Sequence, residues 1–369
     1  MSQPQGLKRS PLHQSHLDLG ARIVPFAGWE MPVQYAGILQ EHGAVRGSAG
    51  VFDISHMGEF FVGGEGASAW LDGILTNRLS KLEAGQGQYS LLCNERGGVI
   101  DDLIVYRLQD DTFFLVVNAS KVAEDRAWLE GHLDGESGVR LDDRSSQYAA
   151  LAVQGPDAPR IYAALAPQAA LPVLPPRNGV VCSGAFLVCR TGYTGEDGFE
   201  FFCPAAEGAD WLRRFVEAGA VPCGLGARDS LRLEMGYPLN GADLTPDRTP
   251  LEAGLGVFVD LDKVPGFVGS DALRAQKARG IPSRLLAFKM AGKSPPPRPH
   301  YPVLVEGEVA GEVTSGGQSP SLGIGIGMAY LPSGIASPGK QIAIDIRGRT
   351  FPAQVVKKPL YNRPKPSTP

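Results

Sequence analysis

Short apolar runs separated by turns make up most of the chain. Residues 99–106 and 113–118 are apolar and rich in β-branched or aromatic side chains, which predicts two strands on either side of the polar residues 109–111. Residues 119–132 then predict a helix. Further strands are predicted at 148–153, 185–190 and 199–203, and further helices at 207–218, 227–236 and Ser270–Arg279.

The pattern changes near Leu285. Beyond that residue the chain contains almost only strands and turns, with breaks such as GKSPPPRPHYP and TSGGQSPSLG, which predicts a separate small β domain. A chain of 369 residues also exceeds the size at which one hydrophobic core keeps growing, so we expect two or three domains.

Charge and cysteine content narrow the function classes. The net charge is −4 and the Lys and Arg residues are scattered, so nucleic acid is not an expected partner. The five cysteines form no CxxC pair and no histidine stands at ligand spacing, which predicts reduced thiols and no metal. The N-terminus lacks a signal-peptide core and no apolar run reaches membrane-spanning length, so we expect a soluble, cytoplasmic protein without membrane contact. No GxGxxG or GxxxxGK[ST] loop supports a dinucleotide or P-loop site.

Two adjacent carboxylates, Asp101 and Asp102, stand at the start of an apolar strand. Because side chains alternate across a strand, Asp102 shares one face with Ile104 and Tyr106, whereas Asp101 shares the other with Leu103. Only one of the two carboxylates is then expected to face inward, and Asp102 is the candidate for a pocket wall. The alternative is that both aspartates end a turn and lie in water.

Glu200 lies between Phe199 and Phe201, where a strand is predicted. A carboxylate there is costly unless something donates hydrogen bonds to it. A planar amino-oxo heterocycle with adjacent N–H donors would satisfy both carboxylate oxygens, much as a guanidinium does. A solvent-facing edge position, or an internal pairing with Arg228 or Arg232, would explain the residue equally well.

Arg228 lies in the first turn of the helix that the glycines of CGLGARDSLRLEMG open. A cation near a helix N-terminus opposes the macrodipole, so Arg228 is expected to face an acidic group of the protein or of a ligand. Arg232 lies one turn further along the same face and is the candidate for a purely structural role.

Ser55 and His56 are adjacent, which is superficially typical of hydrolases. No GxSxG elbow accompanies the serine, and neighbours in a strand point to opposite faces, so Ser55 is not expected to pass its proton to His56. We interpret His56 as a hydrogen-bonded core or pocket-lining residue. Trp29 and Met31 are compatible with either core or pocket wall.

These phrases together resemble the T-protein family of the glycine cleavage system, the aminomethyltransferases, from about Leu12 to Tyr361. The phrases that carry the resemblance are, in order, FAGWEMPVQY, FDISHM, GGVIDDLIVY, VQGP, RTGYTGEDGFE, GLGARDSLRLE, PLEAGLG and TSGGQSPSLG. The family is similar in fold and reaction type to the folate domains of dimethylglycine and sarcosine dehydrogenases, and more distantly to an iron–sulfur cluster maintenance protein.

The resemblance implies an α+β fold of three domains in a ring around a central folate hole. Antiparallel sheets with flanking helices would form the first two domains, and a small β-barrel or jelly-roll-like domain the third. The implied boundaries are 1–53 with 144–246 for a discontinuous first domain, 54–143 with 247–282 for the second, and 283–369 for the third.

The reaction implied by the resemblance takes an aminomethyl group from the dihydrolipoyl arm of H-protein and transfers its methylene to tetrahydrofolate, the co-substrate. The products are 5,10-methylenetetrahydrofolate, ammonia and reduced lipoyl H-protein. The implied acidic residue beside the folate N10 is Asp102. We expect it to orient the amine and stabilise developing positive charge rather than to act as a literal base.

The resemblance also implies the residues around the folate. Glu200 would take the pterin N–H donors, with Tyr193 and Arg228 beside the ring. The other positions that match the family pocket are Tyr89, Met57, Tyr106 and Asn118, and Tyr361 or Arg363 would close the site from the C-terminal domain. A basic patch of Lys357, Lys358, Arg363 and Arg298 is a hypothesis for the surface that docks H-protein.

Two related functions compete with this interpretation. Relatives that demethylate dimethylglycine or sarcosine products are normally fused to a flavin domain, and no dinucleotide fingerprint is present. The maintenance protein, which binds folate without transferase activity, has a cysteine in its KGCYxGQE phrase, whereas this chain reads RTGYTGEDGFE. A scaffold without any ligand would leave Glu200 without a purpose.

Overall fold

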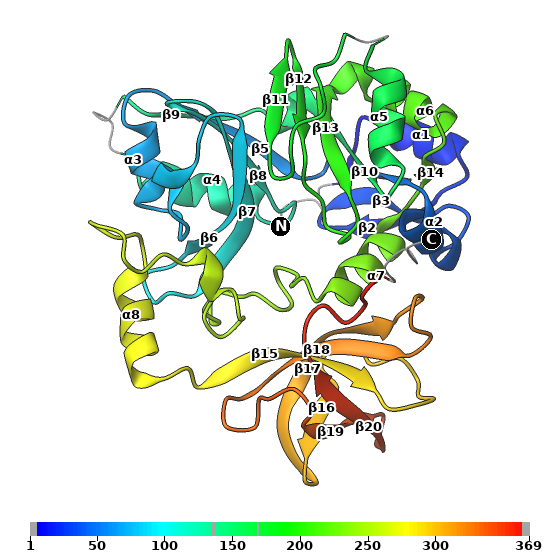
Figure 1. Ribbon diagram of the computed structural model, residues 1–369, viewed down its shortest axis with the longest axis vertical. Coiled ribbons are helices and arrows are strands. Elements are labelled where there is room, and N and C mark those ends of the chain that lie inside the picture. The colour runs from blue at the N-terminus through cyan, green and yellow to red at the C-terminus, as the bar shows by residue number, and fades with distance from the viewer. Residues whose placement is uncertain (1–5, 134–137, 168–169, 364–369) are drawn as a thin grey trace, which may run out of the picture.

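The computed structural model describes residues 6–133, 138–167 and 170–363. Its strands form a small three-stranded sheet, two larger sheets and a closed barrel, and helices flank the two larger sheets. Figure 1 shows these two sheets side by side above the barrel, with the three parts meeting around the centre of the molecule. The α+β class and the C-terminal β domain are therefore as the sequence predicted.

The first large sheet has six strands and is antiparallel except at one edge, where β14 runs parallel to β4. Its order is β11 (Val180–Ser183), β12 (Phe186–Cys189), β13 (Gly198–Pro204), β10 (Tyr148–Gln154), β4 (Gly50–Asp53) and β14 (Val221–Pro222). Alternate residues of β13 enter different cores. Phe199 and Phe201 pack with Trp211 and Phe215 of α6 (Gly208–Glu217), whereas Phe202 faces the second sheet.

The second large sheet has five antiparallel strands. Its order is β6 (Gln86–Cys93), β7 (Val99–Gln109), β8 (Thr112–Val117), β5 (Gly58–Gly63) and β9 (Arg140–Asp143). Leu103 and Val105 of β7 enter the core beneath α3 (Ala67–Asp72) and α4 (Val122–Gly131). Tyr106 and Phe114 enter a different core, which they share with Phe202, so the two sheets pack against each other through these aromatic rings.

The barrel closes through six antiparallel strands. Their order is β15 (Ser283–Met290), β18 (Gly325–Pro332), β17 (Glu308–Gln318), β16 (Pro302–Val305), β19 (Gln341–Ile346) and β20 (Arg349–Val356). Its interior is apolar, with side chains such as Phe288, Val313 and Ile344. Closure removes the unpaired strand edges that would otherwise be exposed.

The remaining elements connect and cover these sheets. The three-stranded sheet contains β1 (Lys8–Arg9), β3 (Trp29–Gln34) and β2 (Arg22–Phe26), and the other α-helices are α1 (His13–Asp18), α2 (Ile38–Gly47), α5 (Ala158–Leu165), α6 (Gly208–Glu217), α7 (Leu225–Met235) and α8 (Ser270–Arg279). The short 3₁₀ helices are Leu79–Lys81, Ser145–Gln147, Ala205–Glu207 and Gly256–Phe258. Helix α7 packs on α2 and β3 and also contacts β17 and β18 of the barrel (Figure 1).

Most predicted elements are present, with small shifts in their bounds. The helix expected at 119–132 begins three residues later, because Asn118 to Lys121 form a turn closed by a hydrogen bond from Lys121 N–H to Asn118 C=O. Strand β4 ends at Asp53, so Ser55 and His56 lie in a turn and not in a strand. The prediction that strand alternation separates these two side chains was therefore wrong in its premise.

No described helix combines the length and apolar character that crossing a bilayer requires.

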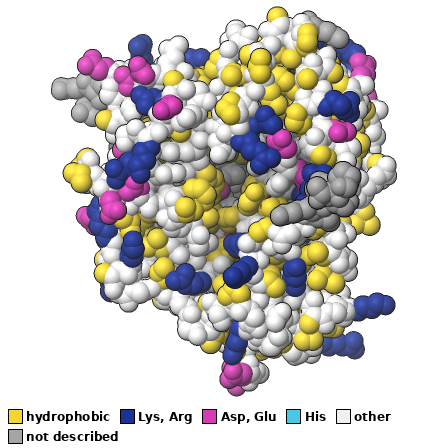
Figure 2. Space-filling view, in the orientation of Figure 1, with side chains coloured by type: hydrophobic (Ala, Val, Ile, Leu, Met, Phe, Trp, Pro, Cys, Tyr) yellow, Lys and Arg dark blue, Asp and Glu magenta, His cyan; other side chains and the backbone are white. Residues whose placement is uncertain are grey.

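On the face drawn in Figure 2, Lys and Arg side chains are dispersed among acidic and apolar ones and form no continuous basic stripe.

Candidate functional site

The Asp101–Asp102 pair lies inside the protein on β7. Asp101 is fully buried, whereas Asp102 keeps part of its surface exposed. Alternation separates the two as predicted, since Leu103 on the Asp101 side enters the core beneath α4, and Tyr106 on the Asp102 side enters the core between the sheets. The prediction that only one carboxylate faces inward was wrong, because the helices covering the outer face of the sheet enclose Asp101 as well.

Two hydrogen bonds hold the Asp102 carboxylate. Tyr89, from the neighbouring strand β6, donates its hydroxyl to Oδ2 of Asp102 over 2.9 Å. Asn118, at the end of β8, places its amide nitrogen 3.0 Å from Oδ1 of Asp102 and 2.8 Å from Oδ1 of Asp101. The same nitrogen lies 2.9 Å from the Asp102 carbonyl oxygen. Three adjacent strands therefore fix one carboxylate.

The environment of Asp102 weakens its acidity. Burial is the largest effect and the nearby Asp101 carboxylate is the second, and together they raise the pKa of Asp102 to about 7, although the hydrogen bonds from Tyr89 and Asn118 act in the opposite direction. A carboxylate with a pKa near neutrality can both attract a cation and accept a proton at physiological pH.

Glu200, on β13, is buried beneath the interface between the sheets. Thr191 donates its hydroxyl to Oε2 of Glu200 over 2.9 Å, and the Tyr106 hydroxyl lies 2.6 Å from the Thr191 hydroxyl. Within the described residues, the other Glu200 oxygen accepts no hydrogen bond. Burial raises the pKa of Glu200, and Thr191 and Arg228 partly offset this effect.

A glycine makes room for Tyr106 beside Glu200. A Cβ on Gly87 of β6 would lie 2.3 Å from Cδ1 of Tyr106, so a larger residue there would displace the ring. The Tyr106–Thr191 contact joins β7 of one sheet to the segment that follows β12 in the other. This contact links the strand that carries Asp102 to the surroundings of Glu200.

Arg228 has no ion pair within the part of the chain that the structure describes. It lies in the first turn of α7, as predicted, and its guanidinium stands 5.0 Å above the Tyr193 ring. Burial lowers the pKa of Arg228, and the charge of Glu200 is the main opposing effect. Among the described residues its five N–H donors form no hydrogen bond to a protein acceptor, so they remain available for a ligand.

Arg232 has the structural role expected for it. Its side chain is buried, pairs with Asp243 over 3.1 Å and with Asp229 over 2.7 Å, and donates to Ser315 of the barrel. Both arginines lie on one face of α7, but only Arg232 is satisfied by the protein.

Tyr193 lies beside Arg228. Its hydroxyl donates to the carbonyl of Pro238, and its ring stacks on Tyr237 with the centroids 5.7 Å apart. Burial raises the pKa of Tyr193, and the electrostatic influence of both Asp102 and Arg228 is felt at its hydroxyl. The predicted residues Asp102, Tyr193, Arg228 and Glu200 therefore belong to one continuous region.

Ser55, His56 and Met57 lie at the edge of this region. Ser55 exchanges hydrogen bonds with the backbone of Ala150 and not with His56, so the structure gives no support to hydrolase chemistry here. His56 is buried, but its Nδ1 has no hydrogen-bond partner among the described residues, which contradicts the predicted hydrogen bonding. Met57 is half-buried in the core between the two sheets. Of the two ambiguous residues, Met31 is fully buried and Trp29 is half-buried beneath the amine of Lys8.

Tyr361 and Arg363 follow the last barrel strand, and the Tyr361 N–H donates to the carbonyl of Glu234 on α7. The guanidinium of Arg46 stands 4.8 Å from the Tyr361 ring, and Arg363 pairs with Glu196 over 3.1 Å. Arg46 also pairs with Glu196 over 3.0 Å. The structure thus links both C-terminal residues to the segment that contains Tyr193, through a partner, Arg46, that the sequence did not reveal.

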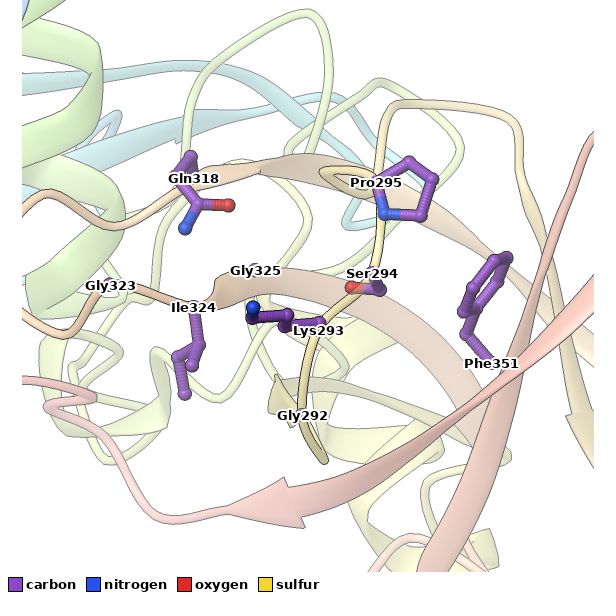
Figure 3. Close-up of a pocket in the computed structure, with 9 residues that line it drawn as sticks. All are labelled: Gly292, Lys293, Ser294, Pro295, Gln318, Gly323, Ile324, Gly325 and Phe351. Atoms are coloured by element: carbon purple, nitrogen blue, oxygen red, sulfur yellow. The ribbon is translucent and has the colours of Figure 1, made fainter.

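Two cavities lie elsewhere in the described structure. One of about 440 Å³ is lined only by barrel-domain residues, and Figure 3 shows the Lys293 side chain, from the loop between β15 and β16, extending toward Ile324 and away from Phe351. Another, of about 580 Å³, lies between the segment around Arg248 and the barrel. Neither is lined by a residue predicted for the site, so the site rests on its side-chain chemistry.

Thr191 was missed from the sequence, although it stands in the phrase RTGYTGEDGFE. Its signal was weak because a threonine beside a glycine is typical of a turn. Arg46 was missed because its partners Glu196 and Glu234 are 150 and 188 residues away. All four basic residues considered for docking are exposed: Arg298, Lys357, Lys358 and Arg363.

Comparisons with known proteins cover nearly all of the chain. Residues 12–263 match the GCVT N-terminal domain, and residues 284–362 match the glycine cleavage T-protein C-terminal barrel domain. The aminomethyltransferase of Geobacillus kaustophilus is 45% identical over 366 residues, covering 97% of this chain and 100% of the relative, and that of Nostoc sp. is 44% identical, covering 96% of each.

A solved structure agrees with these matches. The glycine cleavage system aminomethyltransferase T from Bartonella henselae superposes with a TM-score of 0.91 at 34% identity, covering 97% of this chain and 99% of that one. The chain therefore belongs to the glycine cleavage T-protein family, the aminomethyltransferases.

Proposed function

We propose that the chain transfers the methylene of an aminomethyl group, carried on the dihydrolipoyl arm of H-protein, to tetrahydrofolate. Ammonia is released, and the other products are 5,10-methylenetetrahydrofolate and reduced lipoyl H-protein. The observation that carries the proposal is the pairing of a half-exposed, weakly acidic Asp102 with a second buried carboxylate, Glu200, beside an unpaired Arg228.

The residues present fit tetrahydrofolate. Glu200 has one carboxylate oxygen without a protein donor, which suits the adjacent N–H groups of a pterin. Arg228 has donors without a protein acceptor, which suit a carbonyl or carboxylate oxygen of the same ligand. Tyr193 offers an aromatic face next to both. When bound, tetrahydrofolate would supply the nucleophilic amine.

The role of Asp102 follows from its surroundings. Tyr89 and Asn118 restrict its carboxylate to one orientation, so it can hold an amine in place without reorganising. Its negative charge stabilises positive charge that develops beside it in a partly desolvated site. With a pKa of about 7, Asp102 can also accept the proton that the amine loses.

Tyr106, Asn118 and Tyr89 are proposed as residues that shape the pocket, with Met57 contributing apolar surface. Tyr361 and Arg363 are proposed to close it from the C-terminal side. The domain boundaries after residues 53, 143, 246 and 282 are also a proposal, supported by the membership of the strands on either side of each boundary in different sheets or in the barrel. The ends of the first and third domains, residues 1–5 and 364–369, lie outside the described residues.

Ammonia release from aminomethylated H-protein, together with tetrahydrofolate binding, tests the proposal. Asp102→Asn should bind tetrahydrofolate with little change but lose turnover by on the order of 10²–10⁴-fold. Glu200→Gln should weaken tetrahydrofolate binding, because an amide presents an N–H where the pterin presents another. Full turnover in Asp102→Asn would contradict the role proposed for Asp102 in the reaction. Unchanged tetrahydrofolate affinity in Glu200→Gln would contradict the proposed contact between Glu200 and the pterin. Binding of tetrahydrofolate by the wild type without any ammonia release would favour a maintenance protein of the same fold.

A further inference from the structure

Asp125 is a buried carboxyl group without a conventional partner. It lies in the first turn of α4, its side chain is completely buried, and neither oxygen accepts a hydrogen bond from a described N–H or O–H group. An aspartate in this part of a helix normally accepts backbone N–H bonds or lies in water. The carboxyl of Asp101 lies within hydrogen-bond reach of it.

Two carboxyl groups in hydrogen-bond contact and out of water must share a proton. With both ionised, neither would have a hydrogen to donate, and two like charges would remain uncompensated in the interior. The two cations nearest in sequence are both used elsewhere: Arg126 pairs with Glu130 over 2.8 Å, and the Lys121 amine lies 2.7 Å from Oε2 of Glu124. One carboxyl of the pair is therefore a neutral acid.

The hydrogen-bond pattern assigns the proton to Asp125. Both oxygens of Asp101 already accept N–H groups of Asn118, the backbone N–H at 3.0 Å and the side-chain amide at 2.8 Å. Two donors of this kind stabilise an anion. Asp125 receives none, and burial followed by the Asp101 charge raises its pKa to about 11.

We propose that Asp125 is a positioning residue for the Asp102 site: as a neutral acid it donates a hydrogen bond to the Asp101 carboxylate, which holds Asn118 against Asp102. This role rests on the proposed function, since it acts through Asp102. The beginning of α4 is itself tied to Asn118, because Lys121 N–H donates to the Asn118 carbonyl and Asp125 N–H donates to the Lys121 carbonyl.

The arrangement has two consequences for Asp102. First, Asn118 can donate to Asp102 only while the Asp101 carboxylate fixes its amide group, since that amide lies between the two. Second, the Asp101 anion raises the pKa of Asp102, so the protonation state of the Asp101–Asp125 pair influences the proton affinity at the reacting centre. The other titratable groups that face the pair and Asp102 are Glu124, Lys121, Tyr89 and Tyr193.

Infrared spectroscopy tests the neutral acid directly and without substrate. At pH 9, wild type should show a carboxylic acid C=O band that is absent from Asp125→Asn. The band should persist in Asp102→Asn, because Asp102 is ionised at that pH. Glu59→Gln is a second control, since Glu59 is also buried with both oxygens unpaired and would contribute a band of its own. Absence of any difference between wild type and Asp125→Asn overturns the assignment, whatever the activity of the chain.

Kinetics test the positioning role. An asparagine at position 125 can still donate an N–H to Asp101, so Asp125→Asn should keep kcat within about threefold of wild type. The acid limb of the pH profile, the range in which kcat/KM falls as pH is lowered, should stay in place. Asp125→Ala removes the donor. Asp101 then takes up a proton, Asn118 is released, and kcat should fall by on the order of 10- to 100-fold.

The acid limb distinguishes this role from a purely structural one. In Asp125→Ala the repulsion from Asp101 is lost, which outweighs the loss of the Asn118 hydrogen bond to the ionised form of Asp102, so the limb should move to lower pH. The proposal requires all three results together: near-normal Asp125→Asn, reduced kcat in Asp125→Ala, and a shifted limb in Asp125→Ala. Any other pattern in folded variants, including equal damage in both or an unmoved limb, overturns it. If wild type itself shows no transferase activity, the proposed function fails while the infrared result still decides the state of Asp125.

Discussion

Tyr89 donates its hydroxyl hydrogen to Oδ2 of Asp102 across two neighbouring strands, over 2.9 Å. The contact does not join directly opposed residues, because Tyr89 is paired with Ile104 in the register and Asp102 with Leu91. Diagonal neighbours on one face of a sheet lie within reach of a long aromatic side chain. The hydrogen bond favours the ionised form of Asp102, which Asp101 and burial disfavour.

In Tyr89→Phe we expect the pKa of Asp102 to rise, so that a smaller fraction of the carboxylate is ionised at neutral pH. Loss of a hydrogen bond to the ionised form raises the pKa of Asp102 from about 7, by about one unit. Since the ionised carboxylate is the competent form, activity is lost as pH falls through that pKa, and the acid limb of kcat/KM should move to higher pH. Near pH 7 the rate should drop by roughly fivefold, because the ionised fraction falls from about one half to about one tenth.

Tyr106→Phe is the matched control for this experiment. The Tyr106 hydroxyl contacts Thr191 and not Asp102, so its removal should leave the acid limb in place even if tetrahydrofolate binding weakens. A limb that moves equally in both variants would mean that the shift reports general disturbance of β6 and β7 and not the Tyr89–Asp102 hydrogen bond.

Substitution of Arg228 by Met should affect mainly tetrahydrofolate binding, whereas substitution of Arg232 by Met should affect mainly the stability of the fold. Arg228→Met removes an uncompensated cation, so the free energy of unfolding should change little or increase, whereas the KM for tetrahydrofolate should rise by roughly 10- to 100-fold. Arg232→Met leaves Asp243 buried without its partner and should cost about 3–5 kcal/mol of stability. Urea unfolding and steady-state kinetics on both variants measure the contrast. Loss of stability in Arg228→Met equal to that in Arg232→Met would show that Arg228 supports the fold.

Local sequence patterns predicted the strand that carries Asp102 because alternation is a short-range property. The same rule separated Asp101 from Asp102, and helix-end chemistry placed Arg228 in the first turn of α7. The resemblance to the glycine cleavage T-proteins, a family membership that the comparisons confirm, predicted the site residues that strand alternation alone could not identify.

Contacts between distant segments could not be predicted in this way. The burial of Asp101 depends on α4 covering the outer face of the sheet, and nothing in the pair itself indicates that cover. Asp125 resembles an ordinary acidic residue in a first helical turn, so its sequence gives no sign that it faces another carboxyl group. Arg46 meets Glu196 and Glu234 only after α2, α7 and the RTGYTGEDGFE segment have packed together.

His56 should remain uncharged over the working pH range. Burial is the main cause that lowers its pKa, to about 4, and Arg228 lowers it further while Asp53 opposes the shift. An unfolded histidine titrates near 6.5, so protonation favours unfolding as pH falls from about 6.5 towards 4. Imidazole proton shifts followed by NMR should show no His56 titration between pH 8 and 5.5, and His56→Gln should leave the acid limb near 7 in place. A limb that disappears in His56→Gln would assign it to the histidine and not to Asp102.

Glu234 connects α7 to α2 and to the barrel, and its substitution should reveal how strongly these parts are joined. The carboxylate is completely buried, lies 2.8 Å from Nη2 of Arg46 and 3.3 Å from Nε2 of His42, and accepts the hydroxyls of Ser319 and Ser321. Burial alone would raise its pKa, but the hydrogen bonds from His42 and Ser319 and the positive charges nearby lower it to about 2.

A depressed carboxylate pKa contributes stability that is complete above the unfolded value of 4.5 and is lost as pH falls through about 2. Glu234→Gln should therefore lower the free energy of unfolding by about 3 kcal/mol at pH 7. The difference from wild type should shrink between pH 4.5 and 2, as urea unfolding at several pH values would show. Glu217→Gln, which interrupts an exposed pair with Arg213, should leave stability nearly unchanged. If the loss of unfolding free energy in Glu234→Gln stayed constant down to pH 2, the negative charge of Glu234 would not be what stabilises the contact between α7 and the barrel.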